Sequence, residues 1–213
     1  MRISTYAAPP FMENGFLVSC EATREAVLID PGDAVDDMLD AVARGALEPV
    51  AILLTHAHVD HVTGVPRAKT ALGVPIWLHR ADQFLYDAAV EQARMFGLEV
   101  DPMPPVDEYF EPGTPFAFGE LIVDVRHTPG HCPGGVCLAI GRPDAPAREL
   151  FVGDTLFAGS IGRTDLPGGD YDTLIRSIRE VLFAYPDETP VHSGHGPDTT
   201  VGRERRTNPF LVG

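Results

Sequence analysis

Thr55-His56-Ala57-His58-Val59-Asp60-His61 is the stretch that decides the fold of this chain. It directly follows the apolar segment Val50–Leu54, which predicts a buried β-strand. Side chains two residues apart in extended chain point to the same side, so we expect His56 and His58 to face the same way. Asp60 and His61 should then lie where the chain turns into the next helix. Imidazoles and a carboxylate so closely spaced are natural ligands for zinc, so the stretch predicts a metal site.

Three further candidate ligands, His131, Asp154 and His195, each lie among glycines at the end of a predicted strand. Glycine lets the backbone approach a crowded site and adopt positive φ, and such turns often hold ligands. Each residue alone could equally be an ordinary turn residue. Their repeated placement after apolar strands favours the interpretation as ligands.

The remaining sequence predicts a mixture of strands and helices. The predicted strands are Phe16–Ser19, Ala26–Ile29, Val50–Leu54, Val74–Leu78, Leu121–Val125, Val136–Ile140, Leu150–Val152 and Pro190–His192. Helices are predicted after Asp33 as the N-cap, over Asp82–Phe96 and over Tyr171–Ala184, with a proline-rich loop over Asp101–Pro115. Because no repeat or linker is visible, we expect one α+β domain spanning residues 1–213.

Composition excludes several classes of partner. The chain has 213 residues and a formal net charge of −15, which argues against nucleic acid and anionic membranes as partners. No apolar run is long enough for a membrane span, and Met1–Pro10 shows no secretory signal. The cysteines Cys20, Cys132 and Cys137 are odd in number and form no CxxC pair, which favours a reducing, cytoplasmic location.

Other histidines and cysteines have less specific signals. We expect His79 and His192 to be structural, whereas His127 could hold a ligand by a hydrogen bond or simply form a turn. Cys132 is expected to be a small buried residue, although its position beside His131 leaves sensitivity to oxidation as an alternative.

The order HxHxDH, a lone histidine, an aspartate and a final histidine resembles the ligand order of the metallo-β-lactamase superfamily. More particular phrases resemble its glyoxalase II (hydroxyacylglutathione hydrolase) branch, especially the short, single-domain bacterial members. These phrases are Gly153-Asp154-Thr155-Leu156-Phe157, Gly162-Arg163-Thr164-Asp165 and Gly194-His195-Gly196-Pro197. The resemblance runs from about Asn14 to Phe210, which is nearly the whole chain.

The resemblance implies an αβ/βα four-layer sandwich, in which two mixed β-sheets are flanked by helices. It assigns His56, His58 and His131 to one metal ion and Asp60, His61 and His195 to a second, with Asp154 bridging both. The implied cofactors are two divalent metal ions, zinc first, with iron or manganese as alternatives. Two metals about 3.5–4 Å apart can share a bridging hydroxide that attacks an acyl carbon. The predicted catalytic residues are His58, Asp60 and Asp154, and Asp60 is expected to orient the bridging water.

The implied activity is metal-dependent hydrolysis of a small-molecule thioester such as S-lactoylglutathione or a related acyl-thiol. Arg163 occupies the place where two-domain glyoxalase II enzymes put a basic residue that contacts glutathione, so it is the candidate substrate-binding residue. Its alternative role is an ion pair with Asp165 or Asp170. Pro197 and Asp165 stand where those enzymes have aromatic side chains, and we expect their C-terminal helical domain to be absent. Tight glutathione selectivity is therefore not expected.

Other activities remain open on the same residues. Persulfide dioxygenases of this superfamily keep all seven ligand-type residues but bind one Fe(II), here through His56, His131 and Asp154. The run Ile161–Asp170 favours the hydrolase. Lactone hydrolysis and a non-catalytic metal-binding role are further alternatives, whereas antibiotic hydrolysis is disfavoured because Asp154 stands where the best-known zinc β-lactamases use cysteine. The sequence does not indicate an oligomeric state.

Overall fold

The computed structural model describes residues 1–111 and 113–212. Contacts within this part of the chain group into two compact units, residues 1–111 with 117–121 and residues 113–116 with 122–212. One six-stranded sheet is centred in each unit. The expectation of one domain over residues 1–213 stays a prediction.

The sheet of the first unit has the spatial order β1-β2-β3-β4-β5-β6. Its strands are β1 (Arg2–Tyr6), β2 (Gly15–Ser19), β3 (Glu25–Ile29), β4 (Glu48–Leu53), β5 (Ile76–Leu78) and β6 (Glu108–Tyr109). β1, β2 and β3 pair antiparallel, whereas β3 to β6 pair parallel, so the sheet is mixed. The parallel pairing of β3 with β4 brings the carboxyl ends of these two strands to one edge. The segments that begin at Asp30 and Leu54 therefore start side by side.

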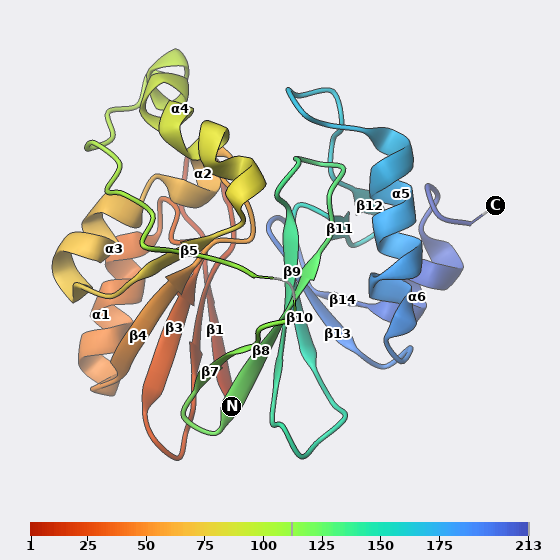
Figure 1. Cartoon of the computed structure of the whole chain (residues 1–213), viewed down its shortest axis with the longest axis horizontal. Helices are drawn as coiled ribbons and strands as arrows, with labels where there is room; N and C mark the ends of the chain where they lie inside the picture. The colour runs from red at the N-terminus through yellow and green to blue at the C-terminus, as the bar shows by residue number, and fades with distance from the viewer. Residues whose placement is uncertain (112, 213) are drawn as a thin grey trace. The chain divides into compact units, whose positions relative to one another are not determined.

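Helices flank this sheet (Figure 1). They are α1 (Val35–Gly45), α2 (Val59–Val62), α3 (Val65–Leu72) and α4 (Gln83–Met95), with a short 3₁₀ helix η1 (Arg80–Asp82) before α4. α1 buries Val35, Met38 and Val42, contacts β1 and β2, and also contacts α3. The predicted N-cap was wrong: Ala34 is the N-cap of α1, and Asp33 instead accepts a hydrogen bond of 2.9 Å from the Thr63 hydroxyl.

The second six-stranded sheet, whose strands β14, β13, β10 and β9 belong to the second unit, has the order β14-β13-β10-β9-β8-β7. Its strands are β7 (Phe116–Phe118), β8 (Leu121–His127), β9 (Val136–Gly141), β10 (Glu149–Gly153), β13 (Pro190–Ser193) and β14 (Thr199–Thr200). β10 pairs parallel with β13, while β8 with β9, β9 with β10 and β13 with β14 pair antiparallel. A two-stranded ribbon, β11 (Leu156–Phe157) and β12 (Ser160–Ile161), follows β10.

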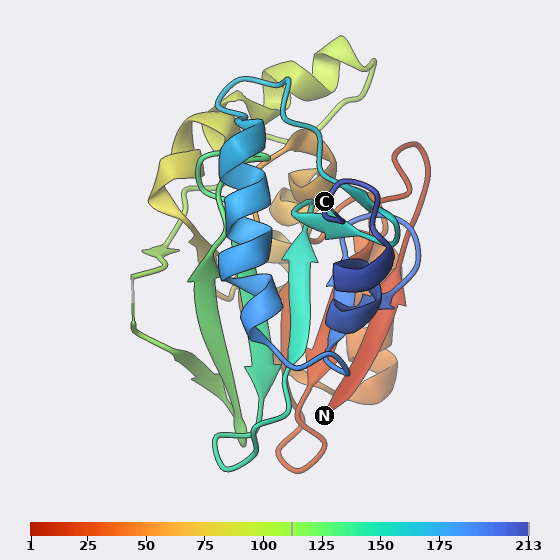
Figure 2. The same cartoon turned by 90° about the vertical axis from the view of Figure 1, so that its right-hand side faces the viewer.

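Helices α5 (Tyr171–Glu180) and α6 (Val201–Thr207) lie over one face of the second sheet (Figure 2). Leu174 and Ile178 of α5 pack with Leu150 and Val152 of β10 in one buried cluster, which holds the helix on the sheet. The predicted helix Tyr171–Ala184 is interrupted at Val181, after which η2 (Leu182–Ala184) continues as 3₁₀ helix.

Most predicted strands are present within a residue or two of their predicted bounds. The predicted loop Asp101–Pro115 is interrupted by the two-residue strand β6, and Pro112 within it lies outside the described residues. β1, α3 and α6 were not predicted. Among the described residues, no helix is long and apolar enough to cross a membrane.

Candidate metal centre

The histidine-rich segment follows β4 as the sequence predicted. The amide of Leu54 still donates to the Trp77 carbonyl of β5, the chain bends at Thr55, and His58 is extended, with φ −67° and ψ 151°. Helix α2 then begins, with Val59 and Val62 buried against the core. The two histidines of HxH therefore lie between β4 and α2, and Asp60 and His61 lie in the first helical turn.

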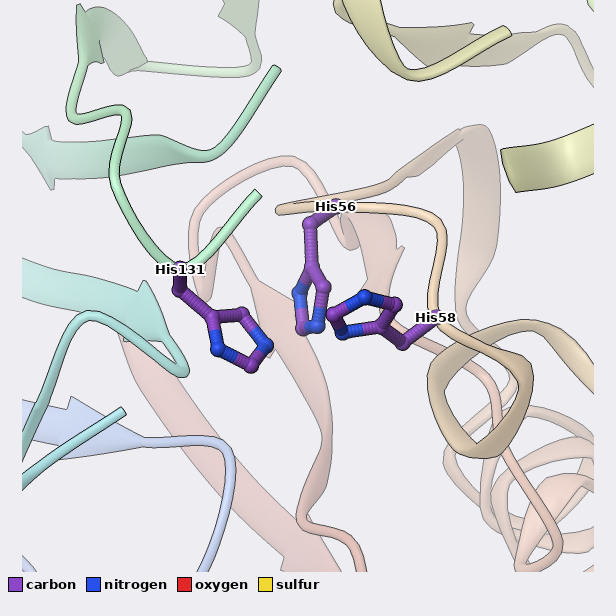
Figure 3. Close-up of side chains that lie close together, drawn as sticks. All are labelled: His56, His58 and His131. Carbon is purple, nitrogen blue, oxygen red and sulfur yellow. The ribbon is translucent and has the colours of Figure 1, made fainter. Parts of the chain in front are cut away.

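Within the first unit, four of the predicted ligands form one cluster. The His56 ring centroid lies 4.9 Å from that of His58 and 4.0 Å from that of His61. Figure 3 shows the rings of His56 and His58 directed toward each other. Asp60 Oδ2 lies 3.9 Å from His61 Nε2. All three imidazoles are buried and Asp60 is partly exposed, so this cluster gathers nitrogen and oxygen donors with one side open to solvent.

Asp30, which the sequence analysis did not predict as a site residue, supports this cluster through hydrogen bonds. Its Oδ1 accepts a 2.7 Å hydrogen bond from the Thr55 amide, and its Oδ2 accepts from the Thr55 hydroxyl at 2.5 Å and from His61 Nδ1 at 3.0 Å. The carboxylate is 1% exposed, so these bonds are shielded from water. The available signal was an aspartate directly after a strand that the sequence predicts, Ala26–Ile29.

Hydrogen bonds fix which ring nitrogen of His56 and His61 carries the proton. His61 Nδ1 faces the Asp30 carboxylate, so Nδ1 donates. The Thr55 hydroxyl donates its proton to Asp30. His56 Nδ1, which lies 3.1 Å from Thr55 Oγ1, must therefore donate to that oxygen. In both rings, Nε2 therefore has the lone pair, and a metal ligand needs that lone pair.

Gly32 is needed where the segment after β3 passes the cluster. A Cβ at Gly32 would collide with the Asp60 carbonyl and with the Glu13 carboxylate. Glu13 is buried, and its Oε1 lies 3.6 Å from His61 Nδ1. The missing side chain thus lets two backbone segments meet, which fixes the turn that carries Asp60 and His61.

Within the second unit, the other three predicted ligands form a second cluster. Asp154 follows β10 and His195 follows β13, and the Gly194 amide donates to the Gly153 carbonyl at 2.8 Å. Asp154 Oδ2 lies 3.7 Å from Nε2 of His131 and 3.7 Å from Nε2 of His195. One carboxylate oxygen therefore faces two imidazoles.

His131 has the same ring orientation as His56 and His61. Its Nδ1 donates to the Arg163 carbonyl at 2.7 Å, which leaves Nε2 directed at Asp154. Gly162 makes this possible, because a Cβ there would collide with the Asp154 carbonyl. The loop of Gly162 and Arg163 thus orients His131 through its backbone.

The Arg163 side chain forms the ion pair that was one of its two predicted roles. Its Nε and Nη2 donate to the two oxygens of Asp165 at 2.8 and 2.7 Å. Hydrogen bonding from Arg163 lowers the pKa of Asp165 to about 2, and the same bonds raise the pKa of Arg163. Both side chains are exposed, so the guanidinium remains within reach of solutes. Its role in substrate binding stays a prediction.

The other singled-out residues have structural contacts. His79 caps η1 by accepting from the Ala81 amide, and His192 Nε2 lies 3.0 Å from Glu149 Oε2. His127 Nε2 donates to the Pro133 carbonyl at 2.8 Å, which is the turn role. The three cysteines are buried thiols, and burial raises the pKa of Cys137 to about 12.

The donor chemistry of both clusters fits a divalent metal of the zinc or iron type. The ligand atoms are imidazole nitrogens and carboxylate oxygens, and the Nε2 atoms of His56, His61 and His131 are held as acceptors by bonds at the opposite ring nitrogen. These donor atoms belong to residues that the sequence analysis named as candidate ligands.

Comparisons with known proteins agree with this chemistry. Residues 8–198 match the Metallo-beta-lactamase superfamily. The chain is 37% identical, over 99% of its length and 98% of the relative's, to hydroxyacylglutathione hydrolase GloC of Haemophilus influenzae. This confirms the resemblance to the glyoxalase II branch.

Solved structures confirm the predicted αβ/βα fold class. BLEG-1 B3 metallo-beta-lactamase superposes with a TM-score of 0.88 at 36% identity and full coverage of both chains. A di-iron-bound form of TTHA1623 gives 0.85 at 44% identity, covering 98% of this chain and 100% of that one. ETHE1 from Myxococcus xanthus gives 0.78 at 28% identity, covering 98% and 84%. The chain therefore belongs to the metallo-β-lactamase superfamily.

Proposed function

We propose that this metallo-hydrolase superfamily member cleaves thioesters of the S-lactoylglutathione type at a dinuclear metal centre. In this proposal, the ligand clusters of the two units act together. His56, His58 and His131 would hold one metal ion, Asp60, His61 and His195 would hold the other, and Asp154 would serve both. The proposed cofactors are two zinc ions, with iron as the alternative because a 44% identical relative has a di-iron-bound form.

One observation carries the proposal: three buried histidines have their Nδ1 protons committed elsewhere. Asp30, Thr55 and the Arg163 carbonyl accept these protons from His61, His56 and His131. Such bonds orient a ring and raise the basicity of Nε2, which is what a metal ligand requires. The position of Asp154 Oδ2, at equal distance from two histidines, supports its proposed bridging role.

The chain's own residues would then divide the work of hydrolysis. When bound, the two metal ions would polarise the acyl carbonyl and lower the pKa of a water molecule toward neutrality. Asp60, the partly exposed carboxylate of its cluster, would accept a proton from that water and orient its attack on the acyl carbon. The tetrahedral adduct collapses with release of the thiolate, so neither serine nor cysteine is needed as a nucleophile.

The proposed substrate is a small molecule, and the proposed location is the cytoplasm. Thioester cleavage is favoured by the 37% identity to hydroxyacylglutathione hydrolase GloC over almost all of both chains. Arg163 is the proposed contact for a carboxylate of the thiol portion. Since Arg163 is already paired with Asp165, we expect only weak selectivity for glutathione.

The test compares substrates on protein whose metal content has been measured. We expect loss of S-lactoylglutathione absorbance with two metal ions per chain. His58→Ala and Asp154→Ala should abolish turnover and lower metal content. His79→Ala, which removes the histidine that caps η1, is the matched control. Normal turnover by either ligand variant would refute the assignment.

A mononuclear iron dioxygenase is the second candidate. It is favoured by the 28% identity to ETHE1 from Myxococcus xanthus. If the protein consumes oxygen with glutathione persulfide and contains one iron per chain, the assignment would be a persulfide dioxygenase and not a thioester hydrolase. Hydrolysis of a β-lactam at a higher kcat/KM than any thioester would also replace it.

A further inference from the structure

A cavity of about 340 Å³ lies in the first unit between the β1–β2 edge of the sheet and the end of α1. β1 is the edge strand (Figure 2), and its pairing sets Arg2 opposite Ser19 and Ser4 opposite Leu17. Because alternate residues of a strand share a face, Arg2, Ser4 and Tyr6 all belong to the face that lines the cavity. None of the proposed metal ligands contributes to it.

Helix α1 closes the cavity with one charged and two small residues. Ala41, Arg44 and Gly45 are three and four positions apart, so they lie on one face of the helix. All three line the cavity. The small residues Ala41 and Gly45 leave the space, and Arg44 adds a second arginine to the lining, which already includes Arg2.

The polar lining consists of donors. Ser19 is 4% exposed, and it lines the cavity. Ser4 and Tyr6 bring further hydroxyl groups to the lining. Leu17 and Leu47 make the rest of it apolar. The cavity thus combines two guanidinium groups and three hydroxyls with an apolar wall.

Nearby acidic groups are only weakly able to neutralise these arginines. Arg44 Nη1 lies 3.5 Å from Asp40, and both side chains are at least 70% exposed, so this pair is worth little. Glu21 interacts electrostatically with Arg2. Its Oε2, however, lies 2.9 Å from the amino group of Met1, with which it forms an ion pair. Arg24 adds positive charge, since its Nη2 donates to the Gly45 carbonyl at 2.9 Å.

We propose that this cavity binds a phosphate monoester with a small apolar body. Two guanidinium groups match the double negative charge of the phosphate, and the Arg forks and hydroxyls match its three terminal oxygens. The leucines would contact the apolar body. This site goes beyond the proposed hydrolysis and does not depend on it.

Calorimetric titration of the metal-loaded protein with phenyl phosphate tests the proposal. We expect one saturable site that Arg2→Ala and Arg44→Ala each weaken at least tenfold, with thioester turnover unchanged. Ser19→Ala should weaken binding without affecting the fold, and Arg142→Ala, an exposed arginine of the second unit, is the matched control.

Three results would overturn the proposal. One is the absence of saturable binding, and another is binding that neither arginine variant weakens, which would place the phosphate at the metal centre. The third is equally tight binding of benzoate, which would show that two negative charges are not recognised. If the wild type does not hydrolyse thioesters, the proposed function is refuted, but the proposed phosphate site is not.

Discussion

Replacing Asp30 with asparagine should disrupt metal binding through the tautomers of two histidines. Asparagine has nearly the same shape and tolerates the left-handed φ of 46° at this position, so the backbone should not be strained. Its carbonyl can still accept from the Thr55 amide, but its NH₂ group replaces the Oδ2 that accepts from the Thr55 hydroxyl and His61. His61 must then accept at Nδ1 and place its proton on Nε2.

The same substitution reaches His56 through Thr55. When the Thr55 hydroxyl no longer donates to Asp30, it can donate to His56 Nδ1, which shifts that proton to Nε2 as well. Loss of one supporting bond typically costs about 10- to 100-fold in metal affinity. Because the two histidines share one network, their effects should not simply add. We expect a loss of about 100-fold or more, which corresponds to about 2.7 kcal/mol.

The assay measures zinc affinity by competition with a chelator, and ¹⁵N NMR of the metal-free protein identifies the protonated ring nitrogens. The free energy of unfolding should fall by about 1–3 kcal/mol, because a neutral amide replaces the charged acceptor of three buried hydrogen bonds. Thr55→Ala should affect His56 alone, and Thr55→Ser should restore it. Asp107→Asn is the control, since this carboxylate also accepts a backbone amide, from Ile76, but lies outside the cluster. Wild-type affinity with unchanged Nδ1–H tautomers in Asp30→Asn would refute the reasoning.

Three further predictions concern the second unit. Burial raises the pKa of Cys137 to about 12, so iodoacetamide at pH 8 should label this thiol only after unfolding; labelling of the native protein, read by mass spectrometry, would contradict this. Leu174→Ala should lower the free energy of unfolding by about 2–5 kcal/mol in a urea titration, because Leu174 is fully buried against the sheet; a loss below 1 kcal/mol would mean that the site collapses around the smaller side chain. Hydrogen bonding from Thr173 lowers the pKa of Asp170, so this N-cap stabilises α5 above the usual pKa of aspartate and loses its effect as pH falls through the lowered value. The Tm difference between wild type and Asp170→Ala should therefore shrink in acid, and a constant difference would exclude this cause.

Residues with local signals were predicted well. An apolar strand followed by HxHxDH is sufficient to place His58 in extended conformation directly before a helix and His61 in the first turn of that helix. Asp154 and His195 were found because each follows an apolar strand and precedes or follows glycine. Their proximity depends on the parallel pairing of β10 with β13, which the sequence did not indicate.

Residues whose roles depend on distant partners were missed. Asp30 is 25 positions from Thr55 and 31 from His61, so no local pattern reveals its bonds. Asp33 was predicted to cap α1 because it has the right residue type, but the Thr63 hydroxyl binds it instead. Helix α6 was missed because Val201–Thr207 is mostly polar. Its Glu204 is fully buried, where it accepts from the Gly159 amide, Thr199 and Asn208.

Arg163 contributes to the protein in two chemically independent ways. Its carbonyl receives the His131 proton, while its guanidinium extends to Asp165 at the exposed surface. A substitution at this position changes only the second contribution, since every amino acid carries the same carbonyl. Substitutions of Arg163 can therefore change the side chain that contacts a solute while the His131 imidazole keeps its orientation. Related chains could diverge in substrate preference here without first losing their metal.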